Sequence, residues 1–307
     1  MLISLIIPIY NEEKIIDKLY TVCIESLEAI TDDFEIICVN DGSKDKSLSI
    51  MKEYHKKDKR FKVLNLSRNF GHQAAYTAGL TYSKGKYIAM MDGDLQDPPH
   101  LIKEMYNKMI ADDLDVVYGS RKDRKEGFVK KFLIKKFHLI FNKISNINAP
   151  ENVGNFSLMN RKALDAFLVL NEKNRYLPGL RFFIGFNQGF VEYTRPDRTI
   201  GDAKMNYSKL FKLAMDALFS FSKLPIRLCF FIGLLGVIFT FIAIIIVLVK
   251  KFIGDAYIGW TSTLLSIYFL GSVQLLFMGI IGEYIHRIFI ETQNRPIYIV
   301  KDYFDNE

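Results

Sequence analysis

The 307-residue chain has few cysteines and lacks several common motifs. Its three cysteines, Cys23, Cys38 and Cys229, follow no metal-ligand or redox spacing, which argues against a zinc site and a disulfide scaffold and indicates reduced thiols of a cytosolic domain. The sequence has no internal repeat, no low-complexity tract and no nucleic-acid-binding motif. It also lacks the G-x-G-x-x-G of nucleotide-dependent dehydrogenases. These absences disfavour a nucleic-acid-binding protein and a dehydrogenase.

Acidic residues are scarce in the middle of the chain. Residues 1–120 contain 15 Lys and Arg against 19 Asp and Glu, residues 121–230 contain 21 against 9, and residues 231–307 contain 5 against 6. The net charge is +7. A basic middle segment followed by an apolar end indicates contact with an anionic surface, and a membrane fits this pattern better than a nucleic acid.

Two stretches near the C-terminus contain no charged residue. They cover residues 228–249 and 256–282. At about 1.5 Å per residue the first reaches roughly 33 Å, the thickness of a hydrocarbon core, and the second is long enough for a tilted span. We expect two transmembrane helices, at about 228–249 and 258–282, that form a hairpin. The alternative, a buried helical hairpin of a soluble protein, is disfavoured because soluble helices rarely stay uncharged for so long.

Basic residues flank the two expected spans unequally. The loop between the spans contains Lys250 and Lys251. The terminal sides contain Lys209, Lys212, Lys223, Arg227, Arg287, Arg295 and Lys301. The positive-inside rule therefore places the large N-terminal domain and both termini in the cytoplasm. We expect a domain at 1–207, a membrane-proximal helix at 208–227, the spans within 228–282, and a cytoplasmic helix and tail at 283–307.

Short apolar runs alternate with helix-like segments in the first 120 residues. The expected strands are 3–9, 34–40, 61–66, 87–91 and 116–119, and the segments between them include 43–54, 72–82 and 99–110. This alternation predicts an α/β domain with a largely parallel sheet covered on both faces. Ligands of such sheets bind beyond the carboxyl ends of the strands, so we expect the chemistry in the loops there.

Residues 128–144 combine aromatic and basic side chains at helical spacing. The aromatic residues are Phe128, Phe132, Phe137 and Phe141, and the basic residues are Lys130, Lys131, Lys135 and Lys136. This pattern predicts a basic amphipathic helix at a membrane interface. A surface helix with one apolar face packed on the domain is the alternative.

Asp92 and Asp94 follow the expected strand 87–91 directly. Two carboxylates at a strand end can bind Mg²⁺ or Mn²⁺ while phosphates complete the coordination shell. Such a metal would neutralise charge on a departing nucleoside diphosphate. The same spacing recurs at Asp113 and Asp115, between a helix and a strand, where capping or solvation is expected. Position in the fold distinguishes the two pairs, and spacing does not.

Polar residues also follow the first two expected strands. Asp41 ends the strand 34–40 and could cap a helix, the commoner role of such a residue, or face a ligand. Near the first strand, Pro8, Tyr10, Asn11 and Glu12 are expected to form a turn whose polar groups could face the same cleft.

Seven motifs follow one another along the chain. They are IPIYNEE at 7–13, VNDGSKD at 39–45, SRNFGHQAA at 67–75, MDGDLQDPP at 91–99, GSR at 119–121, VGNFSLMNR at 153–161 and RPDRTIGDAKMNY at 195–207. Together with the apolar hairpin, their order resembles family 2 glycosyltransferases, specifically bacterial polyprenyl-phosphate (bactoprenol) glycosyltransferases related to dolichol-phosphate mannose synthase. The resemblance implies a Rossmann-like GT-A catalytic domain with a C-terminal two-helix transmembrane hairpin.

The same resemblance implies an activity and a location. It implies metal-dependent, inverting transfer of a sugar from a nucleotide-sugar, UDP-glucose or UDP-N-acetylglucosamine, to polyprenyl (undecaprenyl) phosphate. The lipid-linked product would serve modification of the cell wall or of surface glycans. The location would be the bacterial inner membrane, with a membrane and no nucleic acid as partner. The transmembrane helices could also pair in a homo-oligomer.

Roles of single residues are carried over from the matching motifs. Pro8, Tyr10, Glu12, Asp41, Asp92, Gln96, Asp97 and Arg121 would bind the nucleotide-sugar, Asp92 and Asp94 the metal, and Arg195, Arg198 and Lys204 the acceptor phosphate. Asp94 and position 155 would be catalytic. Here the chain departs from the family pattern, because Asn155 stands where relatives commonly have an aspartate in Gly-Asp-Phe-Arg. Ala203 likewise replaces the usual serine.

Two other interpretations stay open. A processive polysaccharide synthase is disfavoured because the chain lacks a Q-x-x-R-W signature and two spans are too few for a translocation channel. A catalytically impaired, transferase-like membrane scaffold is suggested by Asn155. The intact Asp92, Asp94, Arg198 and Lys204 argue against such general decay.

Overall fold

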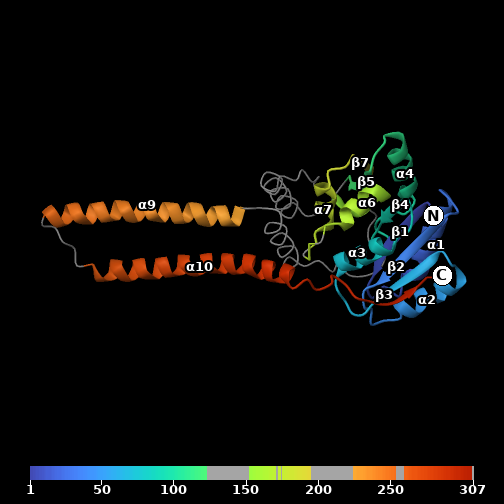
Figure 1. The fold of residues 1–307 in the computed structure, drawn as a ribbon, viewed down its shortest axis with the longest axis horizontal. Helices are drawn as coiled ribbons and strands as arrows, with labels where there is room; N and C mark the ends of the chain where they lie inside the picture. The colour runs from blue at the N-terminus through green and yellow to red at the C-terminus, as the bar shows by residue number, and fades with distance from the viewer. Residues whose placement is uncertain (123–151, 171, 174, 195–223, 254–258, 306–307) are drawn as a thin grey trace. The chain divides into compact units, whose positions relative to one another are not determined.

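The computed structural model of the chain (Figure 1) consists of two units. It describes residues 1–122, 152–170, 172–173, 175–194, 224–253 and 259–305. The first unit contains the described residues up to 194 and those from 296 onward, and the second contains the described residues between 224 and 295. The expected amphipathic helix at 128–144 and most of the membrane-proximal segment 208–227 lie outside the described residues.

Four parallel strands form the centre of the first unit. They are β1 (Ile3–Ile9), β2 (Phe34–Asn40), β3 (Phe61–Leu66) and β4 (Tyr87–Met90). β1 lies between β2 and β4, and β3 pairs with the outer side of β2. All residues of these strands are buried, as expected for parallel strands covered on both faces. The predicted ranges of the first three strands are confirmed, and β4 ends one residue earlier than expected.

Beyond β4 the sheet becomes mixed. β6 (Val153–Asn160) is antiparallel to both β4 and β5 (Val116–Arg121), and β7 (Gln188–Tyr193) pairs in parallel with β5. In the β4–β6 pair Met90 lies opposite Ser157. This register brings the residues that precede Ser157 to the edge of the sheet where β4 ends.

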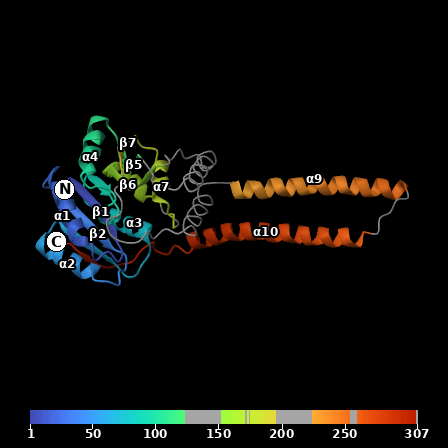
Figure 2. The ribbon, with the colours of Figure 1, turned by 180° about the vertical axis from the view of Figure 1, so that it is seen from behind.

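The end of the chain returns to this sheet as an eighth strand. β8 (Val300–Phe304) pairs with β3 in antiparallel orientation and completes the order β7-β5-β6-β4-β1-β2-β3-β8. Figure 2 shows the red segment after α10 returning to this unit. A register shift separates the pair Asn65–Asp302 from the pair Leu66–Val300. From the sequence we expected a helix and tail at 283–307, so this strand was not predicted.

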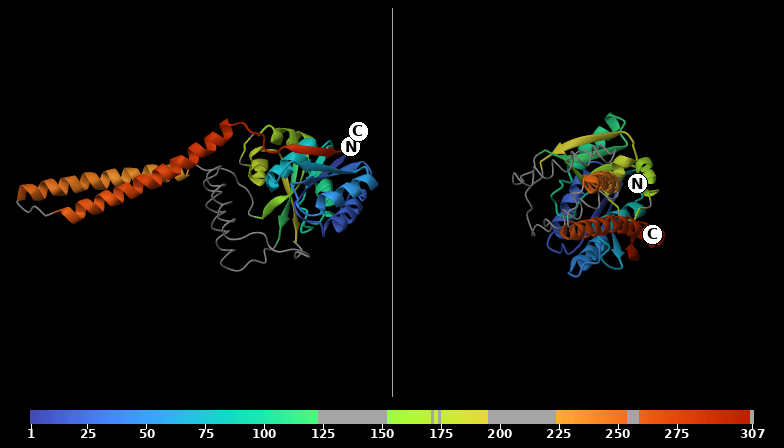
Figure 3. Two further views of the ribbon diagram at one scale, coloured as in Figure 1. Left: turned by 90° about the horizontal axis from the view of Figure 1, so that it is seen from below. Right: turned by 90° about the vertical axis from the view of Figure 1, so that its left-hand side faces the viewer.

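The second unit consists of two long helices, α9 (Leu224–Ile253) and α10 (Trp260–Thr292) (Figure 3). The two helices approach each other at Gly233 and Phe277, where a Cβ added at Gly233 would lie 3.9 Å from the Phe277 ring. Among the described residues, Ser266–Thr292 of α10 is the segment long and apolar enough to cross a membrane. The other predicted span, 228–249, lies within α9, and a transmembrane hairpin stays a prediction.

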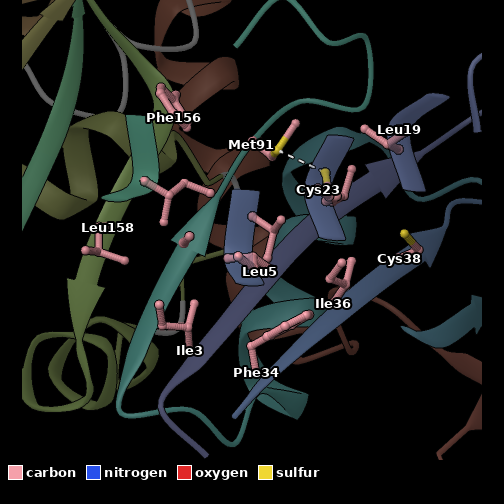
Figure 4. Packing of buried hydrophobic residues seen from close by; sticks show 14 of the residues in the cluster. Ile3, Leu5, Leu19, Cys23, Phe34, Ile36, Cys38, Met91, Phe156 and Leu158 are labelled. Carbon is pink, nitrogen blue, oxygen red and sulfur yellow. Dashed lines mark hydrogen bonds between the residues drawn. The ribbon is translucent and has the colours of Figure 1, made fainter. Parts of the chain in front are cut away.

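Helices cover both faces of the sheet. On one face α1 (Ile16–Glu28), α2 (Ser47–Lys57) and α4 (Leu101–Ala111) bury their apolar sides. The core there joins Leu5 of β1 to Cys23 of α1, and further side chains of it are shown in Figure 4. This burial of apolar surface is the main stabilisation of the α/β unit.

The opposite face carries α3 (His72–Tyr82), α6 (Arg161–Leu168) and α7 (Leu177–Phe183). α3 approaches the sheet closely at Gly79, where an added Cβ would lie 2.3 Å from Cγ2 of Ile6. The predicted range of α3 is confirmed residue for residue. With helices on both faces and one mixed sheet, the expected α/β fold is confirmed.

Candidate active site

The turns that follow β1 and β2 are tied to each other. The Asn11 backbone N–H donates to Ser43 Oγ at 3.1 Å, and the Lys44 backbone N–H donates to Asn11 Oδ1 at 2.8 Å. Asn11 has a left-handed φ of 53°, which asparagine tolerates better than most residues. The neighbouring Tyr10 is 37% exposed, so its ring is available to a ligand at this edge.

Asp41 lies at the end of β2, but its carboxylate is used within the protein. It is only 3% exposed, and its two oxygens accept the backbone N–H groups of Phe70 at 2.7 Å and Gly71 at 3.0 Å. Burial raises the pKa of Asp41, although the two backbone hydrogen bonds act in the opposite direction. Asp41 therefore does not cap the helix that follows it, α2, which has no side-chain cap, and instead fixes the loop that precedes α3. Any contact of Asp41 with a nucleoside stays a prediction.

Asp92 and Asp94 follow β4 and lie against the end of β1. A Cβ added at Gly93 would lie 2.7 Å from Cδ1 of Ile9 and 3.0 Å from the carbonyl oxygen of Pro8. Glycine is therefore required between the two aspartates, because the loop packs onto β1 with no room for a side chain. Pro8 itself is buried in β1 and forms the wall of this site through its backbone.

Two residues of α3 contact the first aspartate of this pair. The Tyr76 hydroxyl donates to Asp92 Oδ1 at 2.8 Å, and His72 Nε2 lies 3.2 Å from the same oxygen. Burial lowers the pKa of His72, but its interactions with the carboxylate outweigh that effect and raise it. Neither residue was predicted from the sequence. Their four-residue spacing at the start of a helix that follows a strand was the available signal.

The loop after Asp94 turns sharply before it enters the interior. Leu95 has a left-handed φ of 54°, and the Gln96 backbone N–H donates to Asp94 Oδ1 at 3.1 Å. The Gln96 side chain is half-buried. This turn keeps the Asp94 carboxylate at the end of β4, beside Asp92.

Asp97 is fully buried and anchors a cluster with Tyr193 and Arg121. The Tyr193 hydroxyl donates to Asp97 Oδ1 at 2.6 Å, and Arg121 Nη2 lies 3.8 Å from the same oxygen. Arg121 also donates from Nε to the Tyr193 hydroxyl at 3.3 Å. Asp97 is fully buried among the described residues. Arg121 is therefore the member of this cluster whose charge faces the site.

Asn155 lies on β6 at the same edge of the sheet. Its Oδ1 is buried and has no hydrogen-bond partner among the described residues. The fully buried Arg181 of α7 donates to the carbonyl oxygens of Asn155 at 2.7 Å and Gly154 at 2.6 Å, and also contacts Ser157 Oγ. Burial lowers the pKa of this guanidinium. Arg181 was not predicted from the sequence, and it places a buried cation beside the backbone of position 155.

The second pair with the same spacing, Asp113 and Asp115, has a structural role at the other end of β5. Asp115 accepts hydrogen bonds from Asn160 Nδ2 at 2.8 Å and from the Asn187 backbone N–H at 3.2 Å. Asp113 is exposed and has a left-handed φ of 49°. The two aspartate pairs therefore lie at different places in the fold, as expected from the sequence.

The structure does not describe the residues that were predicted to bind the acceptor phosphate. Arg195, Arg198 and Lys204 lie outside the described part of the chain. The described residues contain no group of three or more His, Cys, Asp and Glu side chains that could hold a metal ion by themselves. Asp92 and Asp94 still fit a divalent cation whose remaining ligands come from a diphosphate, because both are half-buried oxygen donors side by side at a strand end.

Comparison with known proteins decides the family. The family model described as Glycosyl transferase family 2 matches residues 4–168. An uncharacterized glycosyltransferase of Synechocystis sp. is 39% identical over 302 residues, covering 98% of this chain and 95% of the relative. The chain belongs to glycosyl transferase family 2.

A second relative of this family 2 glycosyltransferase has a more specific name. The prophage bactoprenol glucosyl transferase homolog of Escherichia coli strain K12 is 39% identical over 303 residues, which cover 98% of this chain and 99% of the relative. The resemblance to bacterial polyprenyl-phosphate glycosyltransferases is thereby confirmed. A solved structure, the glucosyl-3-phosphoglycerate synthase of Mycobacterium tuberculosis with Mn²⁺, UDP and phosphoglyceric acid, matches with a TM-score of 0.49 at 16% identity, over 71% of this chain and 76% of that one.

Proposed function

We propose that this glycosyltransferase moves one sugar from a cytosolic nucleotide-sugar to a polyprenyl phosphate at a bacterial membrane. The observation that carries the proposal is the position of Asp92 and Asp94 against the end of β1, in a chain that aligns over 98% of its length with a bactoprenol glucosyl transferase homolog. The apolar α10 supports a membrane location. UDP-glucose or UDP-N-acetylglucosamine is the proposed donor, and undecaprenyl phosphate the acceptor.

The nucleoside is proposed to lie over the turns after β1 and β2. The exposed ring of Tyr10 and the carboxylate of Glu12 are proposed to contact it there. Asp41 supports the same edge by fixing the loop before α3. On the sugar side we place Gln96 and Arg121, with Asp97 and Tyr193 orienting the guanidinium.

The diphosphate is proposed to lie at Asp92 and Asp94. These two carboxylates would hold Mg²⁺ or Mn²⁺, which when bound neutralises charge on the leaving nucleoside diphosphate. Tyr76 and His72 orient Asp92 through its Oδ1, so the carboxylate is directed before the donor arrives. Such preorganisation reduces the cost of binding a charged ligand.

In the proposed step an oxygen of the acceptor phosphate attacks the anomeric carbon with inversion. The bond from that carbon to the diphosphate oxygen breaks, and the nucleoside diphosphate leaves with the electron pair. A phosphate monoester has a second pKa near 6, so the acceptor is already largely dianionic at neutral pH and needs little help from a base. Arg195, Arg198 and Lys204 are proposed to bind the acceptor phosphate.

The test is transfer by the purified full-length protein in detergent. Radiolabelled UDP-glucose, UDP-N-acetylglucosamine and other nucleotide-sugars are supplied with undecaprenyl phosphate and Mg²⁺, Mn²⁺ or a chelator. We expect a lipid-linked monosaccharide with one donor, and none with the chelator. Asp92→Asn and Asp94→Asn should lower turnover by about a hundredfold or more, because they remove a metal-binding charge worth several kcal/mol.

Asp113→Asn is the matched control, because it makes the same chemical change at the structural pair and asparagine tolerates its left-handed backbone. Its turnover should stay near that of the unaltered protein. Equal losses at Asp94 and Asp113 would place the site elsewhere. A lengthening polysaccharide product would favour the processive synthase, and no transfer with any donor would favour the scaffold.

A further inference from the structure

The C-terminal strand carries a polar residue that reaches toward the donor edge of the sheet. Asp302 of β8 accepts a hydrogen bond from Asn65 Nδ2 of β3 at 2.8 Å. These two residues are paired just before the register shift between β3 and β8. Irregularities of this kind re-aim side chains and are commonly functional features of a sheet. Asp302 lies on the last described strand, and its partner lies 237 positions earlier.

From Asn65 the hydrogen bonds continue across β2 to the donor turns. Asn65 Oδ1 accepts from Asn40 Nδ2 at 2.8 Å, and Asn40 Oδ1 accepts from the Ser43 backbone N–H at 3.3 Å. Ser43 Oγ in turn accepts from the Asn11 backbone N–H at 3.1 Å. Asn40 and Asn65 are 2% and 5% exposed, so water cannot readily replace these partners. The two turns assigned to the nucleoside are thus connected to the C-terminal strand.

The groups at the two ends of this series of hydrogen bonds determine which amide groups donate and which accept. An ionised carboxylate can only accept, so Asn65 must present its NH₂ group to Asp302 and its oxygen to Asn40. A backbone N–H can only donate, so Asn40 must present its oxygen to Ser43 and its NH₂ group to Asn65. Both requirements agree. Without the carboxylate, the two amides keep only the constraint from the Ser43 backbone N–H and lose the one that orients Asn65 directly.

We propose that Asp302 is a positioning residue of the donor site, acting through Asn65 and Asn40 on the turn at Ser43. The inference rests on the proposed function, because it assigns the β1 and β2 turns to the nucleoside. It gives the segment after α10 a role in donor binding in addition to its role in the sheet. Asp302 itself is not proposed to touch a substrate.

The experiment compares full-length Asp302→Ala, Asp302→Asn and Asp305→Ala with the unaltered protein. Asparagine at 302 keeps an accepting oxygen, and alanine does not. Asp305 is the matched control on the same tail. It pairs with Lys62 at 2.7 Å and Lys84 at 3.2 Å and takes no part in the hydrogen bonds of Asn65 and Asn40. UDP with Mn²⁺ is the binding probe. Hydrogen exchange at the Ser43 amide is measured on the same samples without any nucleotide.

We expect Asp302→Ala to weaken UDP binding by about three- to tenfold, the effect of one lost hydrogen bond in a buried chain. Exchange at the Ser43 amide should become faster in the same variant. Asp302→Asn and Asp305→Ala should stay within about twofold in both measurements. Equal changes in Asp302→Ala and Asp305→Ala, or no change in either, would overturn the proposal and leave the tail with a general structural role.

The two measurements separate this inference from the proposed function. Failure of the unaltered protein to bind UDP would count against the proposed donor class. Ser43 exchange would still decide whether Asp302 orients the turn, since it requires no ligand. UDP binding that is normal in every variant, with unchanged Ser43 exchange, would refute the inference and leave the proposed function intact.

Discussion

Asn155 combines a buried side-chain oxygen with a nearby cation. Its Oδ1 has no partner among the described residues, although Arg181 is hydrogen-bonded to the backbone of the same residue. A buried acceptor without a donor costs about 1–3 kcal/mol, so a ligand or another segment of the chain is expected to supply the missing donor. The family resemblance implies an aspartate at this position. The environment beside Arg181 would favour that charge, because a nearby guanidinium stabilises a carboxylate.

We therefore expect Asn155→Asp to increase turnover by about tenfold, a change near 1.4 kcal/mol in the barrier. A carboxylate there could orient the acceptor or bind a second cation, roles that the amide fills only in part. Turnover is measured with saturating donor and lipid phosphate between pH 6 and pH 8. Asn155→Ala is the control, and it should lower turnover. Equal rates for Asn and Asp at 155 would show that a charge at this position has no catalytic role.

At the scale of elements, α3 determines how the aspartate loop is oriented. It carries Tyr76 and His72, which both contact Asp92, and it reaches the sheet closely at Gly79. A Cβ at Gly79 would lie 2.3 Å from Ile6 Cγ2 and 3.0 Å from Val39 Cγ2. The glycine therefore allows the helix to lie near enough to the sheet for Tyr76 to reach the end of β4.

Gly79→Ala should lower the free energy of unfolding of the α/β unit by about 1–2 kcal/mol. The clash with β-branched side chains, which costs about 1–3 kcal/mol, outweighs a gain in helix propensity of about 1 kcal/mol. Urea unfolding measures the change, and turnover should fall as well because Tyr76 is displaced from Asp92. Gly271→Ala on α10 is the control, since a Cβ there meets no described atom within 4 Å. A stabilised Gly79→Ala protein would contradict the close packing of α3.

At the scale of the whole molecule, the sheet restricts how the chain can cross a membrane. Strands β1 to β7 precede α10, and β8 follows it, yet all belong to one sheet. If α10 spans the membrane, the chain must cross a second time between β7 and α10 to return to the same side. α9 is the other long helix of the described residues, with 30 residues, and 228–249 within it is uncharged. The predicted hairpin meets this requirement.

We expect the loop between the two helices to face the outside and the catalytic unit to face the cytoplasm. A cysteine introduced at Gly254 should react with a membrane-impermeant reagent on intact cells. A cysteine at the exposed Lys301, or a tag after residue 307, should be protected until the cells are broken. The unaltered protein gives the background from Cys23, Cys38 and Cys229. Labelling of Lys301→Cys from outside would reverse the topology and separate the site from cytosolic donors.

Local patterns in the sequence were enough to predict the central strands, α3 and the contrast between the two aspartate pairs. Runs such as 3–9, in which only Ser4 is polar, are almost entirely apolar because both faces of the sheet are covered, and such runs can be recognised without a partner strand. The Asp92–Asp94 pair was distinguishable because it follows one of these runs directly. The family resemblance added roles that no local pattern carries.

The tertiary structure decided what depends on residues far apart in the chain. The segment 300–304 has no strong strand pattern of its own, and it becomes a strand through pairing with β3. Arg181 is a buried cation only because α7 packs over β6, and the link from Asp302 to Ser43 exists only where β8, β3 and β2 lie side by side. Sequence encodes local propensity directly, whereas these contacts depend on which distant segments the fold brings together.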